Sequence, residues 1–459
     1  MNVPVRLNPE MFREYDIRGV VGTDLTPQTA ERIARAYAAL LAPGSPVVLG
    51  RDNREHSPAL AEAVARGLVA SGCQVVDIGT VISPTFYFAR VHWGIEGGVM
   101  VTASHNPPQF NGFKLGGGPG TLYGEEIQAV RRRAEGGPFR AGRGHLEVRD
   151  ATTPYLDVLR EKIRLGPRPL RVALDCGNGT ASLIAPRVLA DWGAEVLPLY
   201  CESDPRFPHH HPDPVDPHNL GDLVALVRRE RCDLGIGLDG DGDRLGVVDD
   251  QGTILWGDLL MILYWREILP RYPGADVIVE VKCSQALPDE VRRLGGRPFF
   301  YRTGHSLIKA KMREIGAVFT GEMSGHMFFA DEYYGFDDAL YAAGRLLRIL
   351  SHADRPLSAL LGDVPRYPIT PEVRISCPDD RKFAIVAALA DQFKASHEVI
   401  DVDGARILFD EGWGLVRASN TQPVLVVRAE ATSEPALARI KQAIATALAQ
   451  YPEVGPLTW

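Results

Sequence analysis

Three segments of the chain repeat one pattern, and this repeat limits the possible folds more than any other feature. Residues 46–79, 170–200 and 275–304 each read as an apolar strand, a polar loop, an amphipathic helix that ends near glycine, and a second apolar strand. Apolar strands without alternation, joined through a helix, are typical of βαβ units whose sheet is covered on both faces. The sequence therefore predicts three similar α/β domains.

Each repeat continues through a second helix and a third short strand to an unusual polar loop. The three loops are TASHNP at 102–107, DGDGDR at 239–244 and GEMSGH at 321–326. Loops that follow the carboxyl ends of strands are where α/β folds usually bind ligands. We therefore expect the three loops to meet at one site, and three unrelated turns are the alternative.

The last hundred residues have a different order of predicted elements. Strands are expected at 372–376, 399–403, 405–410, 414–418 and 423–429, with helices at 380–395 and 434–450. This order predicts an α+β domain. Clusters of Gly, Pro and charged residues place the boundaries near 150, 253 and 365. The expected domains are 1–150, 151–253, 254–365 and 366–459.

The composition excludes several classes of protein. Of the 459 residues, 45% are hydrophobic and 24% charged, which is typical of a folded globular chain. No run approaches the roughly 20 apolar residues of a membrane helix, and Arg6, Arg13 and Arg18 interrupt the start where a signal peptide would be apolar. The net charge of −8 disfavours a general nucleic-acid-binding surface. We therefore expect a cytoplasmic protein with reduced cysteines and no nucleic-acid or membrane partner.

Three aspartates alternate with glycines in the DGDGDR loop. Asp239, Asp241 and Asp243 repel one another, so their convergence requires a cation, and carboxylates without nearby His or Cys favour Mg²⁺. An EF-hand is excluded because its sixth and twelfth positions hold Arg244 and Asp250 in place of Gly and Glu. A solvated acidic turn remains the alternative.

Ser104, in the TASHNP loop, is a candidate nucleophile. It lacks the G-x-S-x-G surroundings of hydrolases, so acyl transfer is not supported. A serine that faces a magnesium site suits phosphoryl transfer, because the metal neutralises charge on the moving phosphate. Taken alone, a serine in a polar loop is an ordinary turn or N-cap residue.

The GEMSGH loop combines a carboxylate, a hydroxyl and an imidazole between glycines. Glu322, Ser324 and His326 could hydrogen-bond to the vicinal hydroxyls of a sugar, and a loop cap or core histidine is the alternative. The proline-rich tract 205–217 contains three consecutive histidines, for which a rigid turn is favoured over a metal site.

The RASNTQP segment at 417–423 offers donors for a phosphate that is not transferred. An arginine guanidinium can bind a phosphate through two parallel hydrogen bonds, and short hydroxyl and amide side chains lie beside it in the sequence, with another arginine on the next strand. A plain turn is the alternative. These residues are Arg417, Ser419, Asn420, Thr421 and Arg428.

Six motifs in this order resemble the α-D-phosphohexomutase superfamily, and most closely its bacterial phosphomannomutase/phosphoglucomutase branch. They are FREYDIRG at 12–19, TASHNP, DGDGDR, GHSLIK at 304–309, GEMSGH and RASNTQP. The resemblance spans essentially the whole chain. It implies a heart-shaped molecule of three similar α/β domains and a C-terminal α+β domain around one central cleft. In chain order these domains would carry the phosphoserine, metal-binding, sugar-binding and phosphate-binding loops.

The resemblance also implies roles for individual residues. Ser104 would carry the phosphoryl group and, with Asp239, Asp241 and Asp243, contact one Mg²⁺ per active site. The implied catalytic residues are Ser104, His105, Lys114, Arg244 and His305. The implied substrate-binding residues are Tyr15, Arg18, Lys282, Gly304, Glu322, Ser324, His326, Arg417, Ser419, Asn420, Thr421 and Arg428. His305 and Lys114 are the candidates for acid and base.

The implied reaction interconverts hexose 1-phosphate and hexose 6-phosphate through a bisphosphorylated sugar that turns over in the site. Hexose 1,6-bisphosphate would act as activator, and the protein would be a monomer or a weak homodimer. Thr102 and Met323 replace the residues usual in phosphoglucosamine mutases, which favours mannose and glucose. The alternatives are a phosphoglucosamine mutase, a Mg²⁺-dependent phosphatase with a serine nucleophile, and an inactive sugar-phosphate-binding protein.

Overall fold

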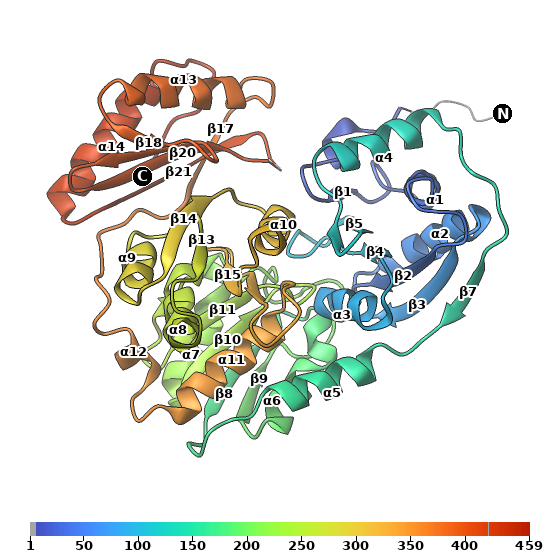
Figure 1. Ribbon diagram of the computed structural model, residues 1–459, viewed down its shortest axis with the longest axis horizontal. Coiled ribbons are helices and arrows are strands. Elements are labelled where there is room, and N and C mark those ends of the chain that lie inside the picture. Colours follow the sequence, from blue (N-terminus) through green and yellow to red (C-terminus); the bar gives the residue numbers. More distant parts are fainter. Residues whose placement is uncertain (1–5, 421) are drawn as a thin grey trace. The chain divides into compact units, whose positions relative to one another are not determined.

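The computed structural model describes residues 6–420 and 422–459, and these fall into two compact units. The first unit comprises the chain up to Arg271 together with His305–Gly362, and the second comprises Tyr272–Gly304 and Asp363–Trp459. Figure 1 labels the helices and strands of both units. None of the described helices combines the length and the apolar run that a membrane crossing requires.

The first unit begins with a seven-stranded mixed sheet. Its order is β1-β5-β4-β2-β3-β7, with β6 paired to β5. The strands are β1 (Ile17–Val20), β2 (Pro46–Arg51), β3 (Gln74–Thr80), β4 (Gly97–Val101), β5 (Phe110–Gly117), β6 (Gly120–Thr121) and β7 (His145–Val148). β2 runs parallel to β3 and β4, whereas β5 runs antiparallel to β4. The carboxyl ends of β2 and β4 therefore lie at the same edge of the sheet.

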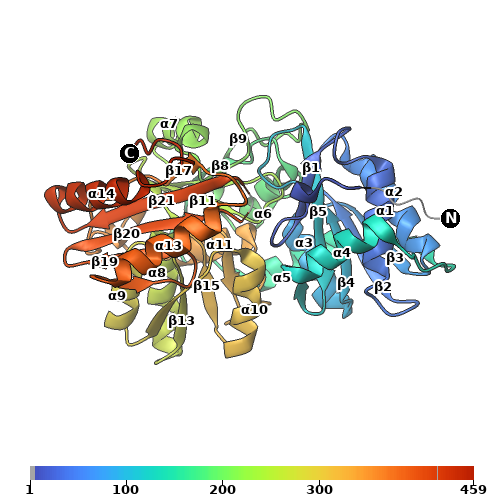
Figure 2. The ribbon, with the colours of Figure 1, turned by 90° about the horizontal axis from the view of Figure 1, so that it is seen from above.

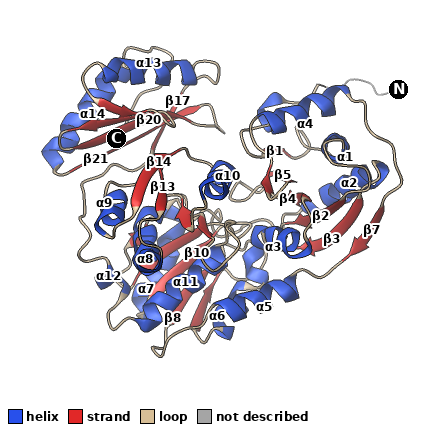
Figure 3. Cartoon of the chain, viewed as in Figure 1, coloured by secondary structure: helices blue, strands red, loops and turns tan. Residues whose placement is uncertain are grey.

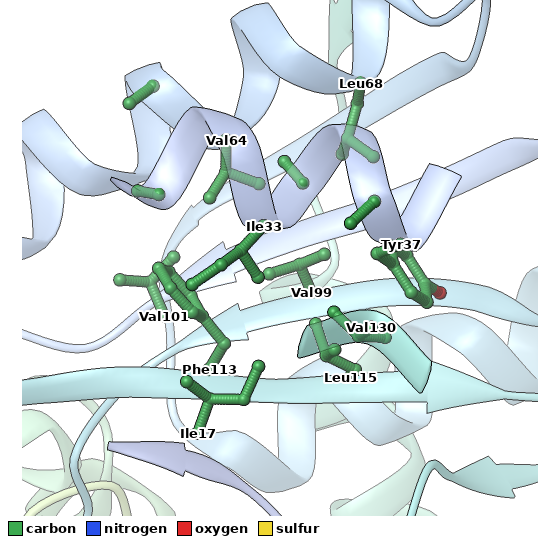
Figure 4. Packing of buried hydrophobic residues seen from close by; sticks show 14 of the residues in the cluster. Ile17, Ile33, Tyr37, Val64, Leu68, Val99, Val101, Phe113, Leu115 and Val130 are labelled. Carbon is green, nitrogen blue, oxygen red and sulfur yellow. The ribbon is translucent and has the colours of Figure 1, made fainter. Parts of the chain in front are cut away.

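Helices connect and cover this sheet. They are α1 (Pro27–Ala38), α2 (Ser57–Ala70), α3 (Ser83–Trp93) and α4 (Glu125–Gly136), preceded by the short 3₁₀ helix η1 (Pro9–Met11). Thr26 caps α1, since its hydroxyl oxygen accepts a hydrogen bond from the backbone N of Thr29 at 3.2 Å. Figure 4 shows Ile33 of α1 and Val64 of α2 packed above Val99 and Phe113 of the sheet. These buried side chains form one core that fixes the strand ends.

A second, five-stranded sheet follows in the order β12-β11-β10-β8-β9. Its strands are β8 (Arg171–Asp175), β9 (Glu195–Leu199), β10 (Leu234–Leu238), β11 (Leu245–Asp249) and β12 (Ile254–Leu255). The associated helices are α5 (Thr152–Lys162), η2 (Thr180–Leu183), α6 (Ala185–Asp191), η3 (Pro217–Leu220), α7 (Gly221–Glu230), α8 (Gly257–Ile268) and η4 (Leu269–Arg271). Strands β8, β9 and β10 are parallel, as the repeat predicts.

The first unit ends with α10 (His305–Ile315), the antiparallel pair β15 (Phe319–Gly321) and β16 (Met327–Phe329), α11 (Ala339–His352) and α12 (Leu357–Leu360). The GEMSGH loop joins β15 to β16.

The second unit contains β13 (Asp276–Glu280), α9 (Ala286–Arg293) and β14 (Arg297–Tyr301), with β13 parallel to β14. It also contains an antiparallel sheet in the order β17-β21-β20-β19-β18. These strands are β17 (Val373–Ser376), β18 (Glu398–Ile400), β19 (Ala405–Phe409), β20 (Gly412–Ala418) and β21 (Val424–Ala431). Helices α13 (Lys382–Lys394) and α14 (Glu434–Leu448), orange to red in Figure 2, share one apolar core with this sheet.

The order of elements predicted for the three repeats and for the last hundred residues is confirmed. The third repeat differs in one respect, because its strands form two separate two-stranded sheets, β13–β14 and β15–β16. β15 has only three residues, and the chain turns back directly into its antiparallel partner β16.

Candidate active site

Three loops of the first unit meet, as the sequence predicts. The loops that leave β4 and β10 lie among the tan segments in Figure 3. Ser104 Oγ donates to Asp239 Oδ2 at 2.7 Å, which joins the TASHNP and DGDGDR loops. His326 Nε2 lies 3.4 Å from Asp243 Oδ1 and 3.3 Å from Arg244 Nε, which joins the GEMSGH loop to the same place.

Close backbone contacts allow the first two loops to converge. A Cβ added at Gly240 would lie 2.4 Å from the carbonyl oxygen of Ser104, so no larger residue fits without a shift. Ser104 itself has a φ of 51°, a left-handed conformation that is uncommon for a residue with a side chain. Such conformations concentrate at functional sites, where the surrounding structure holds them.

The three aspartates of the DGDGDR loop are completely buried, and their carboxylate oxygens lie within 4.8 Å of one another. Burial, with neighbouring Asp243 and Asp241, raises the pKa of Asp239. Within the described residues, the Oδ1 atoms of Asp241 and Asp243 take part in no hydrogen bond. Buried carboxylate oxygens without donors are suitable ligands for a hard cation, so this group can hold a metal ion.

The three aspartates need positive charge nearby, and a lysine of the chain supplies part of it. Lys114, on β5, donates from Nζ to Asp241 Oδ2 at 2.7 Å and also binds Asp243. Burial opposes ionisation of both carboxyls, but Lys114 outweighs it and lowers the pKa of Asp241 and Asp243. Ser83, at the start of α3, donates to Asp241 Oδ2 at 2.7 Å. Lys114 was predicted as a catalytic residue, whereas Ser83 was not among the predicted site residues.

The residues assigned to sugar binding form a hydrogen-bonded group. Glu322 Oε2 and Ser324 Oγ each lie 3.0 Å from His326 Nδ1. Burial and Arg244 oppose protonation of His326, but Asp243 and Glu322 outweigh them and raise its pKa to about 9. The two carboxylates therefore favour the protonated form of His326.

The other two histidines of the site are held neutral. His105 lies beside Ser104, with Nδ1 3.1 Å from Ser104 Oγ, and burial and Arg244 lower its pKa well below the usual value. Burial and Lys309 do the same for His305. Among the described residues, His305 Nδ1 has no hydrogen-bond partner, although Asp337 Oδ2 lies 3.5 Å away.

Tyr15 and Arg18 reach the same site from the first strand and the segment before it. The ring of Tyr15 packs edge-on against that of His305, with centroids 5.1 Å apart. Arg18 Nε donates to Asp16 Oδ2, and its Nη1 donates to Asn106 Oδ1, both at 2.7 Å. Burial and Asp16 raise the pKa of Tyr15 to about 12, so its hydroxyl stays a donor.

Asp337 is a second residue that sequence reasoning missed. Its carboxylate accepts a hydrogen bond from Lys309 Nζ at 2.6 Å and faces His305. Asp243, His326 and Asp337 form the other group of close metal-ligating side chains in the described part of the chain. The only signal in the sequence is the pair Asp337 and Asp338, and two adjacent aspartates are too common to indicate a site.

The remaining predicted site residues lie in the second unit. Arg417, on β20, pairs with Asp403, whose Oδ2 lies 3.1 Å from its Nε and 3.0 Å from its Nη2. Ser419 Oγ accepts from the backbone N of Gln422 at 3.2 Å. Asn420 follows at the end of the strand and is half-buried, and Thr421 lies outside the described residues.

Lys282, Gly304 and Arg428 also belong to the second unit. Lys282 Nζ donates to Glu372 Oε2 at 3.1 Å, and Arg428 Nη1 donates to the backbone oxygen of Lys282 at 2.6 Å. Gly304 has a φ of 135°, which glycine adopts without strain, and directly precedes α10.

Two histidines of the proline-rich tract make polar contacts with residues at and just after the end of β8. His210 Nε2 lies 3.0 Å from Asp175 Oδ2, and His209 Nδ1 lies 2.8 Å from Asn178 Oδ1. Neither group of close metal-ligating side chains in the described chain includes a residue of this tract.

Comparison with known proteins places the whole chain in one family. Four family models match in order and are described as phosphoglucomutase/phosphomannomutase alpha/beta/alpha domains I, II and III and C-terminal domain. They match residues 9–140, 153–252, 256–367 and 372–447.

Individual relatives agree with this result. The chain is 48% identical to the phosphomannomutase/phosphoglucomutase of Pseudomonas aeruginosa over 438 residues, which cover 95% of this chain and 94% of the relative. It is 42% identical to the phosphoglucomutase of Neisseria gonorrhoeae over 452 residues, or 97% and 98% of the two chains.

A solved structure shows the same architecture. The crystal structure of a phosphoglucomutase/phosphomannomutase family protein from Burkholderia thailandensis is 41% identical, with a TM-score of 0.91, and the match covers 98% of this chain and 100% of that one. The predicted fold class, three α/β domains and a C-terminal domain, is confirmed. The chain is an enzyme that belongs to the phosphoglucomutase/phosphomannomutase family of phosphohexomutases.

Proposed function

We propose that the enzyme interconverts hexose 1-phosphates and hexose 6-phosphates, with mannose, glucose or both as the sugar, through a phosphoserine at Ser104. The names of the relatives from Pseudomonas aeruginosa and Neisseria gonorrhoeae support the sugars. The observation that carries the proposal is the hydrogen bond from Ser104 Oγ to Asp239, within a buried group of three aspartates. This arrangement puts a hydroxyl beside a cation site, as phosphoryl transfer requires.

We assign one Mg²⁺ per active site to Asp239, Asp241 and Asp243, with Ser104 as a further ligand. The donor set fits, because its atoms are carboxylate and hydroxyl oxygens and two of the buried oxygens lack a hydrogen-bond donor. When bound, Mg²⁺ offsets negative charge on the oxygens of the phosphoryl group.

In the proposed reaction, phospho-Ser104 donates its phosphoryl group to the free hydroxyl of a hexose phosphate. The resulting hexose 1,6-bisphosphate turns over and returns its other phosphate to Ser104. Free hexose 1,6-bisphosphate would restore the phosphoserine whenever the intermediate escapes. Lys114 and Arg244 stabilise the charge of the phosphoryl group in transfer, because both are cations beside the aspartates, with Lys114 buried and Arg244 partly buried.

The proton of the sugar hydroxyl needs an acceptor, for which we favour His305 over Lys114. His305 is buried and neutral, and its Nδ1 has no hydrogen-bond partner among the described residues. The ammonium group of Lys114 is already bound by two carboxylates. His105, whose Nδ1 lies beside Ser104 Oγ, would orient that hydroxyl.

Substrate binding is assigned to two sets of residues. In the first unit, Glu322, Ser324 and His326 would bind sugar hydroxyls, with Tyr15 and Arg18 beside them. In the second unit, the arginine fork and its neighbours would bind the phosphate that is not transferred. This second set comprises Lys282, Gly304, Arg417, Ser419, Asn420, Thr421 and Arg428.

We further propose that the enzyme is cytoplasmic, acts as a monomer or a weak homodimer, and has no nucleic-acid or membrane partner. The net charge of −8 supports the absence of a general nucleic-acid surface. The domain boundaries at 150, 253 and 365 are likewise proposed. The gaps between the first three matched ranges contain 150 and 253, and the third matched range ends at 367, two residues after the proposed third boundary.

One assay distinguishes this function from its alternatives. The purified enzyme is incubated with the 1-phosphates of mannose, glucose and glucosamine, and the 6-phosphates and inorganic phosphate are measured in parallel. We expect isomerisation of mannose and glucose phosphates, stimulation by hexose 1,6-bisphosphate, and little free phosphate. Release of inorganic phosphate without isomerisation would identify a phosphatase. A preference for glucosamine 1-phosphate would identify a phosphoglucosamine mutase.

A further inference from the structure

Arg54 is a buried arginine in the loop that joins β2 to α2, and it lies outside the six sequence motifs. Its side chain is 1% exposed. Nη2 donates to the carbonyl oxygens of Ser104 at 2.7 Å and Asn106 at 2.5 Å. Nη1 donates to those of Pro107 at 2.8 Å and Phe110 at 3.2 Å. One guanidinium group therefore binds four carbonyl groups of the segment that contains Ser104.

Other contacts fix Arg54 itself. Asp52 Oδ2 lies 3.2 Å from its Nε, and Asp52 Oδ1 accepts from its backbone N at 3.1 Å. The guanidinium carbon lies 5.1 Å from the centre of the Phe207 ring. The backbone N of Asp52 donates to the carbonyl of Val101, the last residue of β4, at 2.9 Å. Arg54 thus links the loop after β4 to the rigid ends of two adjacent parallel strands.

The Ser104 loop needs such support. Its φ of 51° is unfavourable for a serine, and its carbonyl also lies against Gly240 of the aspartate loop. A planar guanidinium can donate to several carbonyls at fixed angles, whereas the ammonium of lysine has three donors around a single atom.

We propose that Arg54 is a positioning residue for phosphoryl transfer, which holds the 104–110 loop so that Ser104 Oγ stays beside Asp239. The inference rests on the proposed function of Ser104. Arg54 does not touch the substrate, so its removal changes the position of the serine and leaves the sugar-binding residues in place.

Arg90, on α3, provides a matched control in the same domain. It is also buried, and it donates to the backbone oxygens of Gly120 at 2.7 Å and Gly118 at 2.8 Å, and to that of Glu96. These carbonyls do not belong to the Ser104 loop. Arg54→Lys and Arg90→Lys therefore remove the same kind of buried interaction, and only the first affects the serine.

The test uses the full chain and measures two quantities. The first is the rate at which glucose 1,6-bisphosphate adds one phosphate to the protein, followed by intact mass. The second is the pair kcat and KM for glucose 1-phosphate. We expect Arg54→Lys to reduce the phosphorylation rate and kcat by about 10²-fold, because small displacements of reacting groups have effects of this size. The KM of this variant should stay within about threefold of wild type. Arg90→Lys should keep both rates within about threefold.

The outcomes distinguish a failure of the proposed function of Ser104 from a failure of the positioning role of Arg54. If wild type takes up no phosphate on Ser104, the proposed function fails. If wild type and Arg54→Lys are phosphorylated equally fast, the inference on Arg54 is wrong. It is also wrong if Arg54→Lys and Arg90→Lys lose the same fraction of kcat. If Arg54→Lys does not fold, Asp52→Asn decides, since it keeps the arginine but removes its charged partner. We expect at least a tenfold lower kcat for that variant, and an unchanged kcat would overturn the inference.

Discussion

Gly240 and Ser104 are in van der Waals contact across two domains of the first unit, and a Cβ at Gly240 would lie only 2.4 Å from the carbonyl oxygen of Ser104. The aspartate loop therefore packs directly against the backbone of the candidate nucleophile. We expect the distance from Ser104 Oγ to Asp239 to depend on this contact.

Gly240→Ala should move the two loops apart. The added methyl group meets backbone atoms, which cannot rotate away, so we expect kcat to fall by about 10²-fold. Gly221→Ala is the matched control, because that glycine in the same domain has no atom within 4 Å of the added carbon. Equal kcat values for the two variants, measured with glucose 1-phosphate, would show that the loop contact is not needed.

Asp241→Asn should weaken metal binding. The substitution removes one of the three charges that attract the cation, so we expect the Mg²⁺ concentration for half-maximal activity to rise at least tenfold. The measurement is a Mg²⁺ titration of EDTA-treated wild type and variant. Full activity of the EDTA-treated wild type without added metal would refute the assignment of a Mg²⁺ site.

Arg417→Ala should affect binding more than chemistry. Loss of charge-assisted hydrogen bonds to the distal phosphate suggests about 1.5–3 kcal/mol, or roughly ten- to hundredfold in kcat/KM, mostly through KM. Lysine should rescue only in part, because it lacks the planar fork.

Steady-state kinetics with mannose and glucose 1-phosphates check this prediction. The rise in KM should be similar for both sugars, since the distal phosphate is common to them. Arg439→Ala serves as control, because that exposed arginine in the same unit pairs only with Glu411 in the contacts described. An unchanged KM of Arg417→Ala for both sugars would show that the loop is only a turn.

Asp338 should make stability depend on pH. This carboxyl caps α11 and accepts from the hydroxyls of Tyr155 and Tyr333, yet burial outweighs these bonds and raises its pKa from 3.8 to about 6. The folded state therefore binds the proton more tightly than the unfolded state. Its contribution to stability is full below about pH 4 and is lost as pH rises through about 6, a change of about 3 kcal/mol.

Asp338→Asn should remove this dependence, because asparagine also caps helices and does not ionise. The urea midpoint of unfolding is measured for both proteins from pH 4 to pH 7. We expect the midpoint of wild type to decrease over this range when it is compared with that of the variant. The exposed Asp354→Asn should leave the pH profile unchanged. Parallel profiles for wild type and Asp338→Asn would contradict the argument.

The sequence predicted most of the local structure because its signals are local. The apolar strands, the glycines at helix ends and the loops after β4, β10 and β15 are short patterns, and the structure confirms their order. The meeting of Ser104 with Asp239 follows from their common place in the repeats, which is a topological argument.

The contacts that the sequence did not predict join residues far apart in the chain. Lys114 lies 127 residues from Asp241, which it binds, and Arg54 lies 50 residues from Ser104. No spacing rule connects such pairs, because they meet only through the order of strands in the sheet. Glu372, the carboxylate beside Lys282, was missed for the same reason.

Phosphorylation of Ser104 can be measured directly. Wild type and Ser104→Ala are incubated with hexose 1,6-bisphosphate, and the added mass and the phosphorylated peptide are determined. We expect one phosphate on wild type, located at Ser104, and none on the variant. The kcat of the variant should be at least about 10³-fold lower, because uncatalysed phosphate-ester cleavage is very slow. A phosphate on another residue, or near-normal turnover by Ser104→Ala, would show that Ser104 is not the phosphoryl carrier.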